Sequence, residues 1–488
     1  MIMAIHHQIF LSLLKFDREM ILNFILICYK SSYNIYIAQD AYLFESFGFN
    51  ANGTFNVTFK NLYTPNLYYT LLSSKEFPIE LLLSASASKF CHGSPPIPKI
   101  RTYVPISANF TFSGVITEKS TYTPLVYNCN KNGTFIDLVQ TFRNPNSYLD
   151  SRWISGDWSQ FSLFAVVLIV FLFWIVNWLC HFRTNVKIHY FLTSTLALGI
   201  GYHLSFFFEL IKLEKTDDAI YQTTIRLLFS FFYNALMYIT LLLSIKGWCV
   251  YKTKLTFKDV FSALIFVLIY TVCNCLLALT TLGKAETIIH LISMFTIMLY
   301  VRELAISITK TNIHFIAHLY VISNAGVTPM STPIYAKYRV YKLLRLAVAF
   351  CCFNITVRLI TSLFNNPFLW IDQLIFDLMQ IAIDIILCIT FKLSKSESSD
   401  QYLMLSDDEY EHTKPEELQL TDIKQISIKE LMKKTGIAWE RGIKLPNAPV
   451  IKDTAQRYDT SRLQAAKSIK PTNETEDYSE SSESMTNL

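Results

Sequence analysis

Three ionisable residues, Arg358, Asp377 and Asp384, interrupt long apolar runs in this 488-residue chain. The two aspartates are seven residues apart, so a helix places both on one face. An ionisable group inside hydrocarbon costs about 2.5–3.5 kcal/mol on insertion scales, so each of the three marks a candidate site. One interpretation is a structural ion pair between Arg358 and Asp377 inside a helix bundle. The alternative is a polar cavity, with Asp384 deeper in it, that accepts a ligand head group or ions.

Other residue patterns do not predict catalysis or a metal centre. His314 and His318 would share one helix face, but no HExxH motif and no nearby acid supplies the further ligands that zinc requires. The chain has neither a glycine-rich phosphate loop nor a nucleophile elbow. We therefore expect no enzyme activity, no catalytic residue, no metal and no cofactor.

Seven apolar segments could position these residues within a membrane. Charged residues are 17% of the chain, against about 25% in typical soluble proteins, and the mean hydropathy is +0.31. Each segment has about the 20 residues that cross roughly 30 Å of hydrocarbon. Within residues 156–393 we place them at Phe161–Cys180, Tyr190–Leu210, Gln222–Ile245, Phe257–Leu279, Glu286–Thr309, Leu343–Leu363 and Leu369–Phe391.

The loop charges predict an orientation for these spans. Eleven Lys and Arg residues fall in or beside the loops that would be cytosolic if the N-terminus is outside, and four fall on the opposite side. Short cytosolic loops carry an excess of Lys and Arg. The sequence therefore predicts a lumenal or extracellular N-terminus and a cytosolic C-terminus, with the lipid bilayer as the first partner.

Residues 39–155 have a different pattern from the spans. Short runs of β-branched and aromatic residues alternate with Asn, Gly and Pro clusters, which predicts a small β-sandwich. Four N-x-[ST] sequons lie there, at Asn52, Asn56, Asn109 and Asn132. Their position on the segment that is predicted to lie outside indicates a glycosylated domain.

Cysteines and the N-terminal apolar run indicate a secretory context. Cys91 and Cys129 are the cysteines of the β-rich segment, and they predict a disulfide in an oxidising compartment. Residues 1–38 resemble a signal segment with a short apolar core at Met20–Cys28, a cleavage position at Ala38 and an alternative start at Met20. An uncleaved anchor is the alternative.

Residues 394–488 are polar and Ser-rich, which predicts a mostly disordered tail with a short helix near 426–434. Tyr402 and Leu405 match the Tyr-x-x-apolar pattern that clathrin adaptors bind, about ten residues after the last span. A solvated juxtamembrane stretch is the alternative. No basic stripe with interleaved aromatic residues exists, so we expect no nucleic-acid partner.

This layout and three stretches of sequence resemble the Golgi-dynamics-domain (GOLD) seven-transmembrane superfamily, which includes the lung seven-transmembrane proteins, the intimal thickness-related receptor family and Wntless. The stretches are Tyr127–Trp153, with an Asn-Cys step and an Asn-Pro near the membrane; Leu241–Thr256, with a Lys-Gly-Trp exit from the third span; and Ala317–Tyr338, the loop before the sixth span. The resemblance implies a GOLD-like lumenal β-sandwich on a Golgi, endosomal or surface protein.

The expected fold is a membrane α-helical, seven-transmembrane helix bundle preceded by a lumenal or extracellular β-sandwich (GOLD-like) domain. The resemblance implies a receptor-like protein that binds an unknown lumenal ligand or cargo protein and acts in protein trafficking. Two alternatives stay open: a receptor that signals to a G protein through its basic loops, and an ion- or lipid-conducting bundle. A rhodopsin-like receptor is disfavoured because the seventh span has no Lys and no Asn-Pro-x-x-Tyr ending.

Overall fold

The computed structural model contains two compact units, which are described separately. The first comprises residues 1–311 and 337–404, and the second comprises residues 312–336 and 405–488. The structure describes residues 33–37, 41–60, 67–75, 99–105, 109–129, 134–181, 186–252, 255–279, 283–361, 368–393, 416–434, 436–440 and 443–452.

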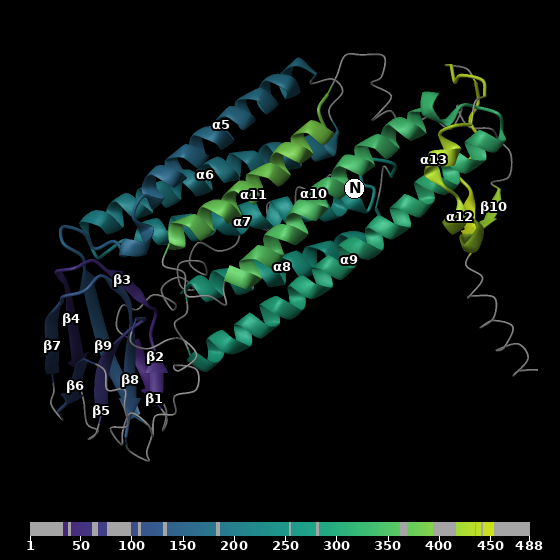
Figure 1. The fold of residues 1–488 in the computed structure, drawn as a ribbon. Helices are drawn as coiled ribbons and strands as arrows, with labels where there is room; N and C mark the ends of the chain where they lie inside the picture. The colour runs from purple at the N-terminus through teal and green to yellow at the C-terminus, as the bar shows by residue number, and fades with distance from the viewer. Residues whose placement is uncertain are drawn as a thin grey trace, which may run out of the picture. The chain divides into compact units, whose positions relative to one another are not determined.

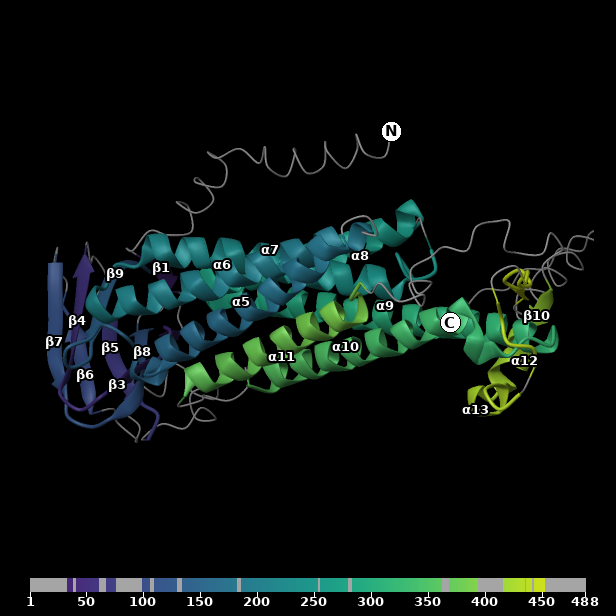
Figure 2. The same cartoon turned by 90° about the horizontal axis from the view of Figure 1, so that it is seen from above.

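Seven described helices are long and apolar enough to cross a membrane, which confirms the predicted number of spans and a multi-pass membrane protein. Four of them, α5, α6, α7 and α11, run side by side in both views (Figures 1 and 2). Their bounds are α5 Gly156–Cys180, α6 Lys187–Lys215, α7 Ile220–Ile245, α8 Phe257–Leu279, α9 Gly283–Asn324, α10 Pro333–Thr361 and α11 Leu369–Thr390. We call the end of the bundle where α5 begins the proximal end, and the opposite end the distal end.

Helix α9 is longer than the sequence predicts. Its 42 residues measure about 63 Å at about 1.5 Å per residue, roughly twice the hydrocarbon thickness. The expected end at Thr309 is wrong because the chain has no Gly or Pro until Gly326. The helix ends there, where Gly326 has a positive φ of 81° and Val327 N–H donates to the Ile322 carbonyl.

Residues before α5 form two β-sheets that pack face to face. One sheet has the strand order β1-β9-β4-β7; in the other, the order is β2-β8-β5-β6 and β3 also pairs with β8. The bounds are β1 Tyr33–Ile37, β2 Ala41–Leu43, β3 Phe47–Phe49, β4 Gly53–Lys60, β5 Leu67–Ser73, β6 Ile100–Val104, β7 Asn109–Ile116, β8 Ser120–Asn128 and β9 Thr134–Arg143. We call this body the strand domain.

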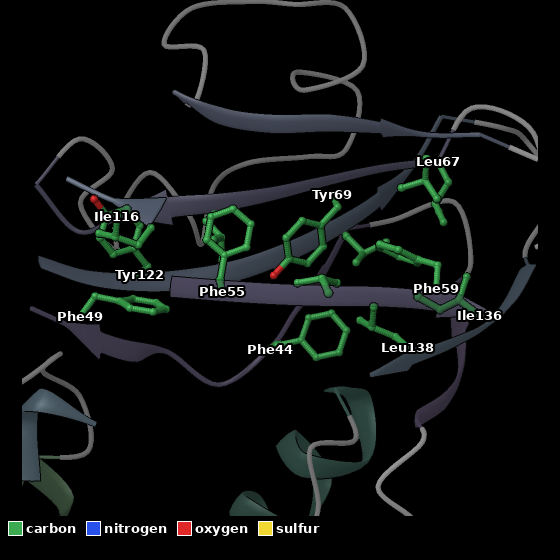
Figure 3. Packing of buried hydrophobic residues seen from close by; sticks show 14 residues of the cluster. Phe44, Phe49, Phe55, Phe59, Leu67, Tyr69, Ile116, Tyr122, Ile136 and Leu138 are labelled. Atoms are coloured by element: carbon green, nitrogen blue, oxygen red, sulfur yellow. The ribbon is translucent and has the colours of Figure 1, made fainter. Parts of the chain in front are cut away.

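The core of the strand domain lies between the two sheets (Figure 3). Strand β4 shows how the sequence produces it: Phe55, Val57 and Phe59 are buried, and the alternate residues face outward. From the other sheet, Tyr69 packs edge-on against Phe59 with ring centroids 5.8 Å apart. The expected sandwich is therefore present, built from a period-two pattern of aromatic residues.

Strand β1 lies within the segment that the sequence analysis assigned to a signal. It pairs antiparallel with β9 from Tyr33 opposite Leu138 to Ile37 opposite Thr134. Cleavage at Ala38 would remove this edge strand. The pairing therefore favours a mature chain that begins at or before Tyr33.

The second unit joins the last turns of α9 to a segment of the tail. Its small core contains Ile316 and Ala317 of α9 with Ile423 of α12 (Leu420–Gln425). Helix α13 (Ile428–Leu431) follows within the range predicted to be helical, and strands β10 (Glu417–Gln419) and β11 (Val450–Lys452) pair in parallel. The described part of residues 416–452 is thus folded, which the polar composition of the tail did not predict.

Candidate functional site

Helix α11 presents a row of polar side chains to the interior of the bundle. Gln373, Asp377, Gln380 and Asp384 follow an i, i+4, i+7, i+11 spacing, which keeps them on one helix face. Asp377, Gln380 and Asp384 are at most 3% exposed. We call these four residues the polar row.

Asp377 is held by two side-chain amides. Its Oδ2 accepts a hydrogen bond of 2.8 Å from Gln160 Nε2 of α5, and its Oδ1 accepts one of 2.9 Å from Gln373 Nε2. Gln160 Oε1 lies 2.9 Å from Nδ1 of His203 on α6, and Gln373 also donates to the Tyr202 hydroxyl at 3.1 Å. Asp377 therefore links α11 to α5 directly and to α6 through the two glutamines.

The deeper half of the polar row contacts α7. Tyr233 OH donates to Asp384 Oδ2 at 2.7 Å, and Gln380 Nε2 donates to Asn234 Oδ1 at 2.6 Å. The second oxygen of Asp384, Oδ1, has no hydrogen-bond partner among the described residues. Hydrogen bonds between membrane helices contribute about 0.6 kcal/mol each on average. These hydrogen bonds fix the rotation of α11 about its axis. Each can be replaced by another hydrogen bond with a small change in free energy.

Arg358 lies near the proximal end of α10. Its guanidinium carbon is 4.5 Å from the centre of the Phe376 ring. Asp377 accepts hydrogen bonds from the two glutamines, and Arg358 is close enough to interact with its charge, so the ion pair that the sequence suggested stays a prediction. Arg358 lines a cavity of about 80 Å³ with Arg226, Asn234 and other polar residues. Neither Asp377 nor Asp384 is among the described residues that line this cavity, so the polar-cavity interpretation also stays a prediction.

An ion pair closes the proximal end between α6 and α7. Glu209 is 5% exposed and accepts hydrogen bonds from Thr223 Oγ1 at 2.9 Å and from Arg226 Nε. Arg226 also stacks on Phe206, with its guanidinium carbon 4.7 Å from the ring centre. The structure turns Glu209 inward, because a paired carboxylate is far cheaper to bury than a lone one.

The strand domain is fixed to the proximal end by a tight corner of chain. Asn144 Nδ2 donates to the carbonyls of Gly48 at 3.1 Å and Leu149 at 2.8 Å. The 3₁₀ helix η1 (Ser151–Trp153) packs against β3, and Arg152 binds the Asp150 carboxylate with Nε and Nη2. A Cβ at Gly48 would lie 2.5 Å from Asp150 Oδ1, so a larger residue would have to displace the Asp150 side chain.

A cavity of about 450 Å³ lies at this junction, lined by both the strand domain and the bundle. Arg226 and Gln373 line it and also line the smaller interior cavity. We call it the junction cavity. Its volume is within the range of about 300–1,000 Å³ that is typical of small-ligand sites. Asp217, in the α6–α7 loop, contributes to its rim, where partial burial raises the pKa of the carboxyl and a hydrogen bond with Thr141 opposes the rise.

The structure places the predicted glycosylation and disulfide residues as follows. Asn52 is an exposed turn residue with a positive φ of 65°, and Asn56 and Asn109 are exposed in β4 and β7. Asn132 lies outside the described residues. Cys129 is disulfide-bonded, and its predicted partner Cys91 lies outside the described residues, so the pairing stays a prediction.

The remaining predicted sites fall in the second unit or beyond the described chain. Tyr402 and Leu405 are outside the described residues. His318 lies beside His314 on α9, as the spacing predicts, but it is 4% exposed and its Nε2 is 3.1 Å from the Pro446 carbonyl oxygen. Within the described chain, no three metal-binding side chains cluster.

Sequence reasoning missed the uncharged members of the site. Gln373 and Gln380 share the helical spacing of the two aspartates, and this signal could have identified them. Gln160, His203 and Tyr233 are single polar residues in three different spans, and only the packing of those spans brings them to the polar row. Arg226 is near the proximal end of α7, and the sequence alone counts it among the charges of a loop.

No protein-family model matches this chain, and a search of curated proteins gives no match either.

Proposed function

We propose that this multi-pass membrane protein is receptor-like, resides in the secretory pathway and binds a ligand or cargo protein through its strand domain to act in protein trafficking. The observation that carries the proposal is the junction cavity. It is lined by strand-domain residues and by α6 and α7, and Gln373 connects its lining to the polar row. A ligand in this cavity contacts both parts at once.

The strand domain and the helix bundle are coupled because the corner of chain between β9 and α5 is rigid. Asn144 and Arg152 fix the chain between β9 and α5 with hydrogen bonds to Gly48, Leu149, Asp150 and Ser46. A ligand that moves Gln373 therefore competes with the hydrogen bonds that Gln373 donates to Asp377 and Tyr202. Because the individual ties are weak, a modest difference in ligand affinity can shift α11 between two arrangements.

The orientation in this proposal places the N-terminal strand domain in the lumen and the tail, residues 394–488, in the cytosol. The excess of Lys and Arg in the distal loops supports it. The exposure of Asn52, Asn56 and Asn109 also supports it, because an oligosaccharide can be attached at each without disturbing the core. A GOLD-like identity of the sandwich and a clathrin adaptor at Tyr402 belong to the same proposal.

The test is localisation and cargo delivery in intact cells. Full-length tagged protein is imaged against Golgi, endosome and surface markers, and proteins cross-linked to it are identified with and without Arg152→Ala, which loosens the junction. Lys119→Ala, an exposed change in the strand domain, is the matched control. Steady Golgi or endosomal signal and a cargo captured less by Arg152→Ala support the proposal. Surface localisation with nucleotide exchange on a G protein would overturn it.

The cytosolic part of the proposal has its own test. Tyr402→Ala should shift the protein from internal membranes toward the surface, whereas Tyr410→Ala, outside the sorting pattern, should not. Equal distributions of the two variants and the unchanged protein would remove the adaptor from the proposal.

A further inference from the structure

Helices α9 and α10 lie side by side (Figures 1 and 2). The Tyr341 hydroxyl of α10 donates a hydrogen bond of 3.0 Å to the Ile308 carbonyl of α9. The two helices are consecutive spans and run in opposite directions, so residues before Ile308 on α9 lie at the depth of residues after Tyr341 on α10. This contact therefore relates both the depth and the rotation of the two helices.

One side of this helix pair carries a stripe of exposed apolar side chains. A helix turns by about 100° per residue. Counted from the contact of Ile308 with Tyr341, the members of the stripe point roughly 80–140° away from the partner helix. Because the helices are antiparallel, they all point to the same side of the pair, where they face lipid. The members are Leu291, Phe295 and Met298 on α9 and Leu346 and Phe353 on α10.

Four basic residues continue the stripe toward the distal end. They are Arg302 on α9 and Arg339, Lys342 and Arg345 on α10. By the same rotation count, all four point to the side of the stripe, at roughly 40–160° from the contact between the helices. At about 1.5 Å of rise per residue, they lie within roughly 12 Å of one another along the pair. Arg345 is half-buried and the other three are exposed. We call these four residues the basic patch.

The ion pairs between described residues include no member of the basic patch. Residues 287–361 of the sequence contain a single acid, Glu303. Glu303 binds Lys246 of α7 at 2.7 Å, and the rotation count places it on the other side of the helix pair from Arg302. The two helices therefore supply four cations and no carboxylate on the side that faces lipid.

The basic patch lies at the level of phospholipid headgroups. About 20 residues cross the hydrocarbon, so a span that starts at Ile288 of α9 leaves it near Ile308. On α10, the same count back from Arg358 ends near Tyr338. The deepest members of the patch lie about 10 Å inside this boundary, and long Lys and Arg side chains extend from such positions to the headgroups.

We propose that the basic patch binds an anionic phospholipid whose headgroup carries a phosphate monoester, and that the acyl chains of this lipid lie along the apolar stripe. Guanidinium groups bind phosphate oxygens through paired hydrogen bonds, and Arg302 and Arg345 present such groups from two neighbouring helices. A phosphate monoester carries nearly two negative charges at neutral pH, which suits several cations better than the single charge of a diester. Clusters of Lys and Arg beside membrane helices are typical sites for anionic lipids. The inference goes beyond the proposed function, because it requires neither a cargo protein nor a particular organelle.

The test measures direct binding to the full-length protein in phosphatidylcholine nanodiscs. Three short-chain lipids are titrated by calorimetry, with empty nanodiscs as the blank: dioctanoyl phosphatidic acid, which has the monoester, dioctanoyl phosphatidylglycerol, which has a diester, and the neutral dioctanoyl phosphatidylcholine. We expect phosphatidic acid to bind about tenfold more tightly than phosphatidylcholine, with phosphatidylglycerol between them, because each nearby Lys or Arg adds to the attraction. Glycerol phosphate, which has the monoester without acyl chains, should bind more weakly than phosphatidic acid.

Three variants locate the site. Lys342→Gln should weaken binding of phosphatidic acid about threefold to fivefold, and Arg302→Gln should do the same from the neighbouring helix. The matched control is Lys310→Gln, which changes the net charge equally at an exposed position of α9 but on the other side of the helix pair; it should leave the affinity unchanged. Size-exclusion chromatography confirms that the variants are folded.

Equal affinity for the three lipids overturns the inference. So does equal weakening by Lys342→Gln and Lys310→Gln, because the total charge and not the patch would then attract the lipid. Binding of glycerol phosphate as tight as that of phosphatidic acid would replace the lipid by a free phosphate. These outcomes are independent of localisation: selective lipid binding by a protein that captures no cargo would remove the trafficking function and leave the lipid site in place.

Discussion

At the scale of single residues, Asp377 shows how this bundle accommodates a carboxylate. Two glutamine amides surround it, and one of them extends the network to His203. Amide donors bind both oxygens without bringing a further charge of their own into the bundle. Among the described residues, Asp384 accepts a hydrogen bond from the Tyr233 hydroxyl alone, so the two aspartates of one helix face have different surroundings.

Replacing Asp377 by Leu should lower the free energy of unfolding by about 1–3 kcal/mol, because Gln160 Nε2 loses its acceptor and Gln373 keeps only the Tyr202 hydroxyl. Thermal unfolding in detergent measures the change. Leu378→Ala, on the outward face of α11, is the control and should have little effect. A loss for Asp377→Leu no larger than that of the control would show that the network does not stabilise the fold.

Asp217 predicts a pH dependence. Partial burial raises the pKa of its carboxyl above the usual range for Asp, with the neighbouring Asp218 adding to the rise. Because burial disfavours the ionised carboxylate, Asp217 should lower the stability of the folded protein as the pH rises through the raised pKa, and Asp217→Asn should remove this loss. The lining groups Glu45, Asp150, Glu209 and Arg226 also face the cavity, so the comparison is between the unchanged protein and Asp217→Asn. Calorimetry at several pH values checks this; an identical pH profile for both would assign the dependence to another group.

At the scale of elements, the C-terminal end of α7 shows how one residue of the sequence joins neighbouring helices. Lys246 is 6% exposed and donates to Glu303 of α9 at 2.7 Å and to Ser262 of α8 at 2.7 Å. Its charge therefore ties three helices together at the distal end. Glu303 is held in place by its charge-assisted contact with this buried lysine.

Gly247, the next residue, should tolerate no side chain. It has a positive φ of 93°, and an added Cβ would lie 1.9 Å from the Tyr251 ring. We expect Gly247→Ala to lower stability by more than the roughly 1 kcal/mol that the backbone conformation alone costs. Gly326→Ala is a matched control, since Gly326 also has a positive φ but has open space around it. Equal melting temperatures for the two variants would contradict the steric argument.

At the scale of the whole molecule, each of the two units brings together segments that are far apart in the sequence. In the first, the strand domain and the helices share the junction cavity, so the site depends on two segments that are separate in sequence. In the second, residues of the tail pack on the end of α9 around Ala317 and Ile423. A composition that predicts disorder along the tail as a whole misses this, because a few isoleucines suffice to cover one helix end.

The pairing of β1 with β9 predicts the start of the mature chain. If a signal segment is removed, we expect the N-terminus of the purified protein at or before Tyr33, because the sheet otherwise loses an edge strand. N-terminal sequencing of protein from cells measures this directly. A start after Ile37 would show that β1 is absent from the mature protein.

The sequence by itself determined the seven spans, the sandwich before them and the two aspartates on one face of α11. These follow from apolar length and from periodicity, which are local properties of the chain. It did not determine the partners of those aspartates, since Gln160, His203 and Tyr233 are ordinary single polar residues until three helices pack together. The junction cavity was likewise decided only by tertiary structure: Asp217, Gln140 and Trp153 come from a loop, a strand and a 3₁₀ helix, and no spacing in the sequence relates them.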